Sequence, residues 1–359
     1  MNNQNDYNDN KKITYHEQTD ISNILKLREV LKTLPPFCRD YFRAMDPVTT
    51  TNTRISYAYD IRIFFQFLLD ENPAFKNYSL KDFTVDVLDQ LKAVDIEEYL
   101  EYLKVYKNGD KTETNGERGM KRKLSALRSF YAYYFKHEFI KTNPTVLVDV
   151  PKIHDKSIIR LDSDEVALLL DHIEHCGDEL TGQKRAYYEK TKERDLAIVT
   201  LLLGTGIRVS ECVGLDVEDI DFKNNGIKIT RKGGNEMVVY FGSEVERALH
   251  QYLTVREGVT PVTGHEHALF YSTQRKRIGI QAVENLVKKY ARAITTTKKI
   301  TPHKLRSTYG TALYQETGDI YLVADVLGHR DVNTTKKHYA AMDDARRRKA
   351  ASAVHLRED

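Results

Sequence analysis

The stretch ERDLAIVTLLLGTGIRVSE (193–211) decides how the C-terminal half of this chain is interpreted. Its run of mostly apolar residues, 196–203, is long enough for a helix and predicts one that is buried on all sides. Gly204 and Gly206 then end the helix, because glycine readily adopts the backbone conformation that closes one. Arg208 and Glu211 follow directly, so the stretch predicts a charged pair next to a core helix.

The segments on either side extend this into a second domain, residues 161–359. Upstream, Asp162 or Ser163 can cap a helix, and the polar residues 177–192 fit either a loop or a helical excursion. Downstream, residues 217–241 alternate apolar and polar side chains around KGGN, which indicates a β-hairpin. Helical segments continue from there. We therefore predict an α-rich domain with a small antiparallel β-sheet.

Residues 21–146 have the pattern of a helical bundle. The apolar side chains of its last helix recur at steps of three and four residues: Met120, Leu124, Leu127, Tyr131 and Tyr134. The polar residues 1–20 are expected to form a flexible tail, and residues 147–160, which lack a helical period, a linker. The predicted fold is thus mainly α, in two domains.

Basic side chains gather in the last part of the first domain. Between residues 118 and 141 there are seven Lys or Arg residues against one acid, Glu138. The candidate DNA contacts among them are Arg118, Lys121, Arg122, Lys123 and Arg128. A local basic surface can bind phosphates although the whole chain carries a net charge of only +3. The alternative is an ordinary solvated helix face.

Composition excludes several classes of protein. With 41% hydrophobic and 30% charged residues, the chain suits a folded, water-soluble protein. No apolar run approaches the roughly 20 residues that span a bilayer, and no signal peptide is visible, so a cytoplasmic location is expected. The three cysteines are far apart, which predicts reduced thiols and no zinc site.

Five basic groups and one phenol follow one another along the second domain. In chain order they are Arg208 in GTGIRVSE, Lys232 in TRKGG, His303 and Arg306 in TPHKLR, His329 in LGHRD, and Tyr339 in TTKKHY. Each alone has an ordinary explanation, such as a surface ion pair or a helix-end histidine. Together they suit a phosphodiester under attack, because guanidinium groups bind its oxygens, a lysine can protonate the leaving oxygen and a phenol can attack.

None of the quoted motifs contains a D-x-D pair or a carboxylate cluster. The set therefore predicts covalent transfer through Tyr339 without a metal or another cofactor.

The ordered set strongly resembles the tyrosine recombinase (phage integrase) family, over about residues 40–355. The resemblance implies a helical core-binding domain followed by a catalytic domain, which together clamp the DNA duplex. It gives Arg208 the role of phosphate clamp with Glu211 as its supporting acid, and Lys232 that of general acid. It makes His303, Arg306 and His329 further phosphate ligands and Tyr339 the nucleophile.

Within the family the chain is most similar to the Xer branch and its stand-alone XerS type, on KERDLAI (192–198), TRKGG, TPHKLR and the length of 359 residues. This implies site-specific recombination through a 3′-phosphotyrosine and a Holliday junction, in the service of chromosome dimer resolution. It also implies double-stranded DNA with inverted half-sites, a homodimer on each site and a homotetramer in the synapse. The segment after Tyr339 would couple neighbouring protomers.

The chain departs from the family pattern at three places. Tyr339 follows His329 by ten positions, where many relatives have nine. Arg231 stands where the family has the first glycine of G-K-G, which predicts a stiffer hairpin, and Tyr240 replaces a common proline.

Three alternatives stay open at this stage. The chain could be an integrase or excisionase of a phage or conjugative element, although about 20 polar residues before the first helix argue against a full arm-binding domain. It could be a type IB topoisomerase, which the Xer-like bundle disfavours. A non-catalytic DNA-binding regulator is the third, and it would need neither Tyr339 nor Lys232.

Overall fold

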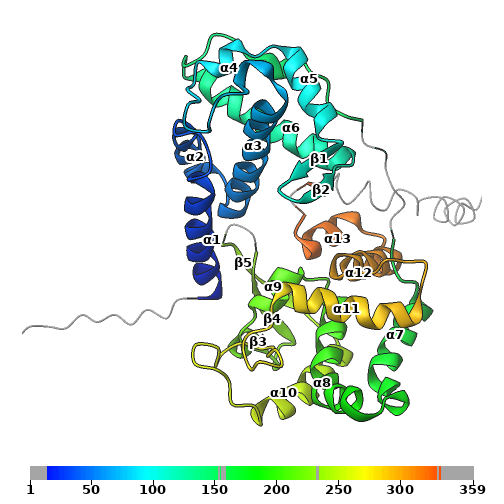
Figure 1. The fold of residues 1–359 in the computed structure, drawn as a ribbon. Coiled ribbons are helices and arrows are strands. Elements are labelled where there is room, and N and C mark those ends of the chain that lie inside the picture. The colour runs from blue at the N-terminus through cyan, green and yellow to red at the C-terminus, as the bar shows by residue number, and fades with distance from the viewer. Residues whose placement is uncertain (1–13, 153, 155–158, 232–233, 330, 333–359) are drawn as a thin grey trace, which may run out of the picture. The chain divides into compact units, whose positions relative to one another are not determined.

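The computed structural model divides the chain into two compact units, Met1–Asp155 and Lys156–Asp359 (Figure 1). It describes residues 14–152, 154, 159–231, 234–329 and 331–332. Helices dominate both units and each holds a small antiparallel sheet, which confirms the mainly α fold predicted from the sequence. None of the described helices is long and apolar enough to cross a membrane.

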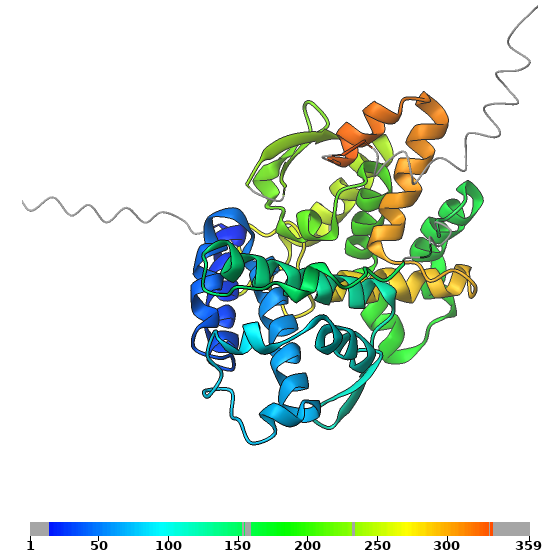
Figure 2. The ribbon, with the colours of Figure 1, turned by 90° about the horizontal axis from the view of Figure 1, so that it is seen from above.

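The first unit is a bundle of helices around an aromatic core. Its elements are α1 (Tyr15–Leu31), α2 (Cys38–Ala44), η1 (Asp46–Val48), α3 (Thr51–Glu71), η2 (Pro73–Phe75), α4 (Val87–Gln90), α5 (Ala93–Tyr102), β1 (Val105–Asn108), β2 (Lys111–Thr114), α6 (Glu117–Lys136) and η3 (Pro144–Val146). α3 packs against both α1 and α6 (Figures 1 and 2). The buried rings of Phe64, Phe65 and Phe130 meet edge to face, which adds to the stabilisation that burial gives.

Threonine side chains fix where two of these helices begin. The Thr14 hydroxyl accepts the Glu17 N–H at 3.2 Å, and the Glu17 carboxylate accepts the Thr14 N–H at 2.8 Å. This capping box satisfies two donors that the first turn leaves unpaired. α1 therefore begins at Tyr15, inside the segment that the sequence predicted to be a flexible tail. Thr50 caps α3 in the same position.

The prediction that residues 21–146 are all helical was incomplete. Residues 105–114 form an antiparallel hairpin in which Asn108 pairs with Lys111. Gly109 at its tip has a φ of +62°, a conformation that glycine adopts without strain. Gly109-Asp110 between two strands is a signal for a two-residue hairpin turn, so the sequence did hold the information.

The second unit consists of helices and one three-stranded sheet. Its elements are α7 (Ser163–His175), η4 (Cys176–Glu179), α8 (Gly182–Thr205), α9 (Val209–Gly214), η5 (Val217–Asp219), β3 (Ile220–Asp221), β4 (Gly226–Thr230), β5 (Glu236–Tyr240), α10 (Ser243–Glu257), α11 (Ile280–Ile294), α12 (Pro302–Thr317) and α13 (Ile320–Leu327). The strand order is β3-β4-β5, and the hairpin predicted within residues 217–241 is confirmed as β4 and β5.

α8 is the central helix of this unit. Its second half is almost entirely buried, as the apolar run predicted, and Gly206 closes it with a φ of +63°. The polar residues 182–192 form its first turns, so the excursion is helical rather than a loop. Asp162 caps α7, and its N–H donates to Glu165 at 2.8 Å. The three thiols, of which Cys38 and Cys212 are buried, are all free.

Candidate active site

The C-terminal end of α13 is the point at which the candidate residues meet. A helix leaves its last carbonyl groups without partners inside the helix, and this end carries a partial negative charge. Arg306 on α12 donates from Nη1 to the carbonyl oxygen of Gly206 and from Nη2 to that of Leu327. Its side chain is 4% exposed, so these two contacts fix a buried cation between the ends of α8 and α13.

Arg208 reaches the same place from the start of α9. Its Nη2 donates to the carbonyl oxygen of Gly328 at 3.3 Å. Its Nη1 donates to Glu211 at 2.8 Å, and its backbone N–H donates to the other oxygen of that carboxylate at 2.7 Å. The Glu211 side chain is buried while that of Arg208 is 37% exposed. Glu211 thus holds the Arg208 guanidinium from its buried side and leaves part of the guanidinium open to solvent.

The two histidines occupy different environments. Gly328 ends α13 with a φ of +62°, and His329 comes next, where its N–H donates to the carbonyl oxygen of Ala324 at 2.8 Å. The His329 side chain is half-buried, whereas His303 is exposed on the first turn of α12. His303 precedes Arg306 by one turn, so both project from the same side of α12.

Lys232 and Tyr339 lie outside the described residues, as does the C-terminal segment expected to couple protomers. The described residues therefore bring together Arg208, Glu211, Arg306 and His329, with His303 close by along α12. Their roles remain predictions. Among the described residues, no group of three or more His, Cys, Asp or Glu side chains could hold a metal ion.

Arg231 is a further cation at this site, and the sequence motifs assigned it no part in phosphate binding. Its Nη2 donates to the carbonyl oxygen of Val326 at 2.7 Å and its Nη1 to that of Asp325 at 3.3 Å. Burial lowers the pKa of Arg231, the charge of Glu211 opposes the shift, and that of Arg208 adds to it. Three guanidinium groups thus bind the last carbonyls of α13, an arrangement that concentrates positive charge where an anion could be held.

The candidate DNA contacts of the first unit prove to be of two kinds. Arg118 and Lys121 are exposed on α6. The others contact the unit itself. Arg122 pairs with the buried Asp60 at 2.5 Å, and Arg128 donates to the carbonyl oxygens of residues 145 and 148.

Lys123 does not fit its predicted role as a DNA contact. Its side chain is 6% exposed and donates to Asn115 at 2.9 Å, so it cannot act as a surface cation. The helical period explains this, because Lys123 and Leu124 both lie on the inner side of α6.

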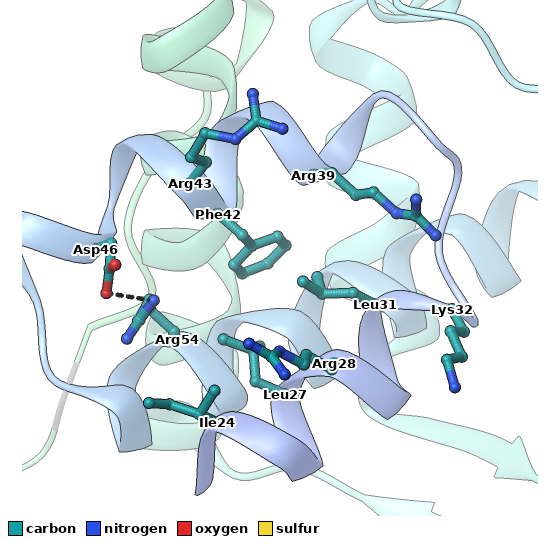
Figure 3. A pocket seen from close by; sticks show the side chains of 10 residues that line it. All are labelled: Ile24, Leu27, Arg28, Leu31, Lys32, Arg39, Phe42, Arg43, Asp46 and Arg54. Carbon is teal, nitrogen blue, oxygen red and sulfur yellow. Dashed lines mark ion pairs between the residues drawn. The ribbon is translucent and has the colours of Figure 1, made fainter. Parts of the chain in front are cut away.

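A second cationic region of the first unit surrounds a pocket of about 600 Å³ between α1, α2 and α3 (Figure 3). Ile24, Leu27, Leu31 and Phe42 form its apolar lining. Its cations are Arg28, Lys32, Arg39, Arg43 and Arg54. Arg54 pairs with Asp46 at 2.6 Å, while no ion pair of Arg28 or Arg39 is found among the described residues.

Comparison with known proteins decides the family. Residues 160–346 match the phage integrase family. The chain is 32% identical to the tyrosine recombinase XerC of Caldanaerobacter subterraneus, over 93% of its own length and 91% of that protein's. The chain belongs to the phage integrase family.

This tyrosine recombinase is similar to further members. It is 31% identical to the tyrosine recombinase XerS of Lactococcus lactis, over 88% of the chain and 93% of the relative. Among solved structures, the XerH recombinase bound to its palindromic difH substrate has a TM-score of 0.61 at 22% identity, over 84% of this chain and 79% of that one. A Tn1549 transposon integrase in complex with circular intermediate DNA has a TM-score of 0.60 at 22% identity, over 84% and 94%. These two show a shared fold.

Family membership confirms the predicted enzyme class: the chain is a tyrosine site-specific recombinase, and DNA is its partner.

Proposed function

We propose that this recombinase cuts and rejoins DNA at a site with inverted half-sites, and that its role is Xer-type resolution of chromosome dimers. The observation that carries the chemistry is the meeting of Arg208, Arg306 and His329 at the end of α13. Similarity to XerC and XerS relatives over most of the chain supports the Xer role. Because the proposed substrate is chromosomal DNA, we also propose a cytoplasmic location.

The first step is binding of the scissile phosphate. Arg208 and Arg306 each present a planar, permanently charged fork, and two such forks suit the two non-bridging oxygens of a phosphodiester. The carbonyl groups of Leu327 and Gly328 now occupy part of each fork. These contacts hold both side chains in place before the phosphate arrives, which lowers the cost of reorganisation in the transition state. His303 and His329 complete the phosphate ligands.

The second step is attack by Tyr339. Its phenolic oxygen forms a bond to phosphorus while the bond to the 5′ oxygen breaks, which leaves a 3′-phosphotyrosine. The phenol releases one proton, and Lys232 donates one to the departing 5′ oxygen. One phosphate ester replaces another, so the bond energy is conserved and no ATP is needed. The 5′ hydroxyl of a partner strand then reverses the reaction and produces a Holliday junction.

Recombination between two sites requires four such centres. We propose a homodimer on each site and a homotetramer in the synapse, because inverted half-sites match the two-fold symmetry of a dimer. The palindromic substrate of the XerH relative fits the same arrangement.

A suicide substrate tests this function. A nicked duplex that carries a candidate site from the DNA next to the gene is incubated with the protein in the presence of EDTA. The expected result is a covalent protein–DNA adduct that Tyr339→Phe abolishes. Tyr321→Phe is the matched control, since Tyr321 is 71% exposed on α13 and has no proposed role. Absence of the wild-type adduct on every site, or an adduct with Tyr339→Phe, would overturn the mechanism.

A further inference from the structure

The hairpin of the second unit is tied to α13 by one side chain, Arg231. This residue directly follows β4, and its backbone N–H donates to the carbonyl oxygen of Asn235 at 2.8 Å, which closes the hairpin. Its guanidinium reaches a segment more than 90 residues further along the chain, where it binds the carbonyl oxygens of Asp325 and Val326.

Gly328 makes this contact possible. A Cβ atom at that position would lie 1.7 Å from Nη1 of Arg231, far inside any permitted contact. The guanidinium therefore fills the space that a side chain would take. The positive φ of Gly328 is a second reason for glycine there. Arg231 and Gly328 thus form a matched pair, one on the hairpin and one directly before His329.

The carbonyl groups at the end of α13 are divided among three arginines. Arg306 binds that of Leu327 and Arg208 that of Gly328, and both come from helices of the phosphate site. Arg231 alone comes from the hairpin. Its Nε is buried without a hydrogen-bond partner in the described part of the chain, so this placement has a desolvation cost that the two carbonyl contacts must offset.

We propose that Arg231 is a positioning residue for leaving-group protonation: by anchoring β4 to the last turn of α13, it fixes the hairpin on which Lys232 comes next in sequence. This inference rests on the proposed function, in which Lys232 is the general acid. A neutral side chain at position 231 would leave the hairpin without its anchor, while the phosphate contacts of Arg208 and Arg306 would persist. Loss of the anchor should therefore slow the chemical step rather than DNA binding.

A change of leaving atom separates this role from a general structural one. A 5′-bridging sulfur leaves as a thiolate, whose conjugate acid has a pKa near 8.5, and it needs no proton in the transition state. Single-turnover cleavage is measured for Arg231→Ala and Arg231→Lys on oxygen and sulfur suicide substrates, with DNA affinity measured in parallel. Arg185→Ala is the matched control, because Arg185 is an exposed arginine of α8 that only approaches Glu189.

We expect Arg231→Ala to cleave the oxygen substrate about 10-fold or more slowly, in the range of general-acid effects, and the sulfur substrate at nearly the wild-type rate. The cleavage rate of Arg231→Lys should fall between those of the wild type and Arg231→Ala, since lysine keeps the charge but lacks the planar fork that spans both carbonyl groups. Gly328→Ala should reproduce the preference for sulfur, and adding it to Arg231→Ala should not increase that preference further.

The inference would be overturned if Arg231→Ala cleaved the oxygen substrate at the wild-type rate. It would also be overturned if the variant lost cleavage rate equally on the oxygen and sulfur substrates. Failure of the wild-type protein to cleave either substrate would instead refute the proposed function.

Discussion

Glu211 holds the Arg208 guanidinium from the inside of the second unit, and this single carboxylate accepts two hydrogen bonds from the same residue. In Glu211→Gln one of the two acceptors becomes an amide N–H₂ that faces a donor. Loss of a charge-assisted bond costs about 1.5 kcal/mol, which corresponds to roughly 10-fold slower cleavage if Arg208 acts in the transition state. Single-turnover adduct formation measures the effect.

Glu189→Gln is the control for this prediction, because Glu189 is an exposed acid on α8. An unfolding curve for each variant shows whether the fold is kept. Glu211→Gln protein that is fully folded and cleaves at the wild-type rate would contradict the role given to Arg208.

At this scale the sequence predicted the order of the site residues but not all of its members. Arg208, Arg306 and His329 stand in motifs whose residue types already indicate a phosphate site. Arg231 could not be found this way, because its partners are backbone carbonyl groups of α13, and a carbonyl carries no sequence signal. Lys123 is different, because its place beside Leu124 in the helical period of α6 already indicated a side chain that faces the core.

Helices were easier to predict than the elements between them. The periods of α6 and α8 come from apolar side chains within one segment, so a local pattern decides them. The hairpin at residues 105–114 was missed because its side chains are mostly exposed and show no apolar alternation, although Gly109-Asp110 marked its turn. A polar strand pair is defined mainly by its backbone hydrogen bonds, which composition does not reveal.

A buried polar network joins α8 to α11. It gives two residues of the KERDLAI motif, Arg194 and Asp195, a structural role. Arg194 donates to Asp195 and to the carbonyl oxygen of Tyr271, and the Tyr290 hydroxyl donates to Asp195 at 3.0 Å. Asp195→Ala leaves the guanidinium without its counter-charge, which should reduce the free energy of unfolding by about 3–5 kcal/mol. Urea denaturation of the variant and the wild type measures this.

Tyr290→Phe provides the comparison, because it removes the hydroxyl that donates to Asp195 and accepts from Lys289 but keeps the ion pair. Tyr290→Phe should reduce the free energy of unfolding by about 1 kcal/mol. Equal costs for the two variants would show that the charge pair contributes no more than an ordinary hydrogen bond.

The buried Asp60 on α3 gives the first unit a pH dependence. Burial raises the pKa of its carboxyl group to about 6 although Arg122 and Lys123 lower it, so loss of hydration outweighs the two cations. The folded state therefore favours the protonated acid. The stability that this preference contributes is present at pH 4 and is lost as the pH rises through 6.

Asp60→Asn removes the titration while it keeps the shape of the side chain. The stability of this variant relative to the wild type should increase between pH 4 and pH 7, by up to about 3 kcal/mol for a shift of roughly two pKa units. Urea denaturation at several pH values measures the difference. A difference that does not change with pH would refute the raised pKa.

At the scale of the whole molecule, charge is distributed so that a net charge of +3 hides local cationic surfaces. The first unit has two of them: Arg118 and Lys121 on α6, and the rim of the pocket in Figure 3. They differ in what lies between the cations. The pocket is lined by apolar side chains, which a phosphate could not contact favourably. The α6 cations are exposed to solvent. We therefore expect the α6 cations to contact DNA.

Salt dependence distinguishes the two surfaces. Each phosphate contact contributes about 0.9 to the slope of log K against log salt, because binding releases condensed counterions. Arg118→Ala combined with Lys121→Ala should reduce the slope by about 2 and weaken binding similarly on all sequences, while Arg28→Ala combined with Arg39→Ala should leave it unchanged. Anisotropy titrations of a labelled duplex at several salt concentrations measure both pairs. If the pocket pair reduces the slope and the α6 pair does not, DNA passes over the pocket, and α6 is the solvated helix face that the basic run alone would suggest.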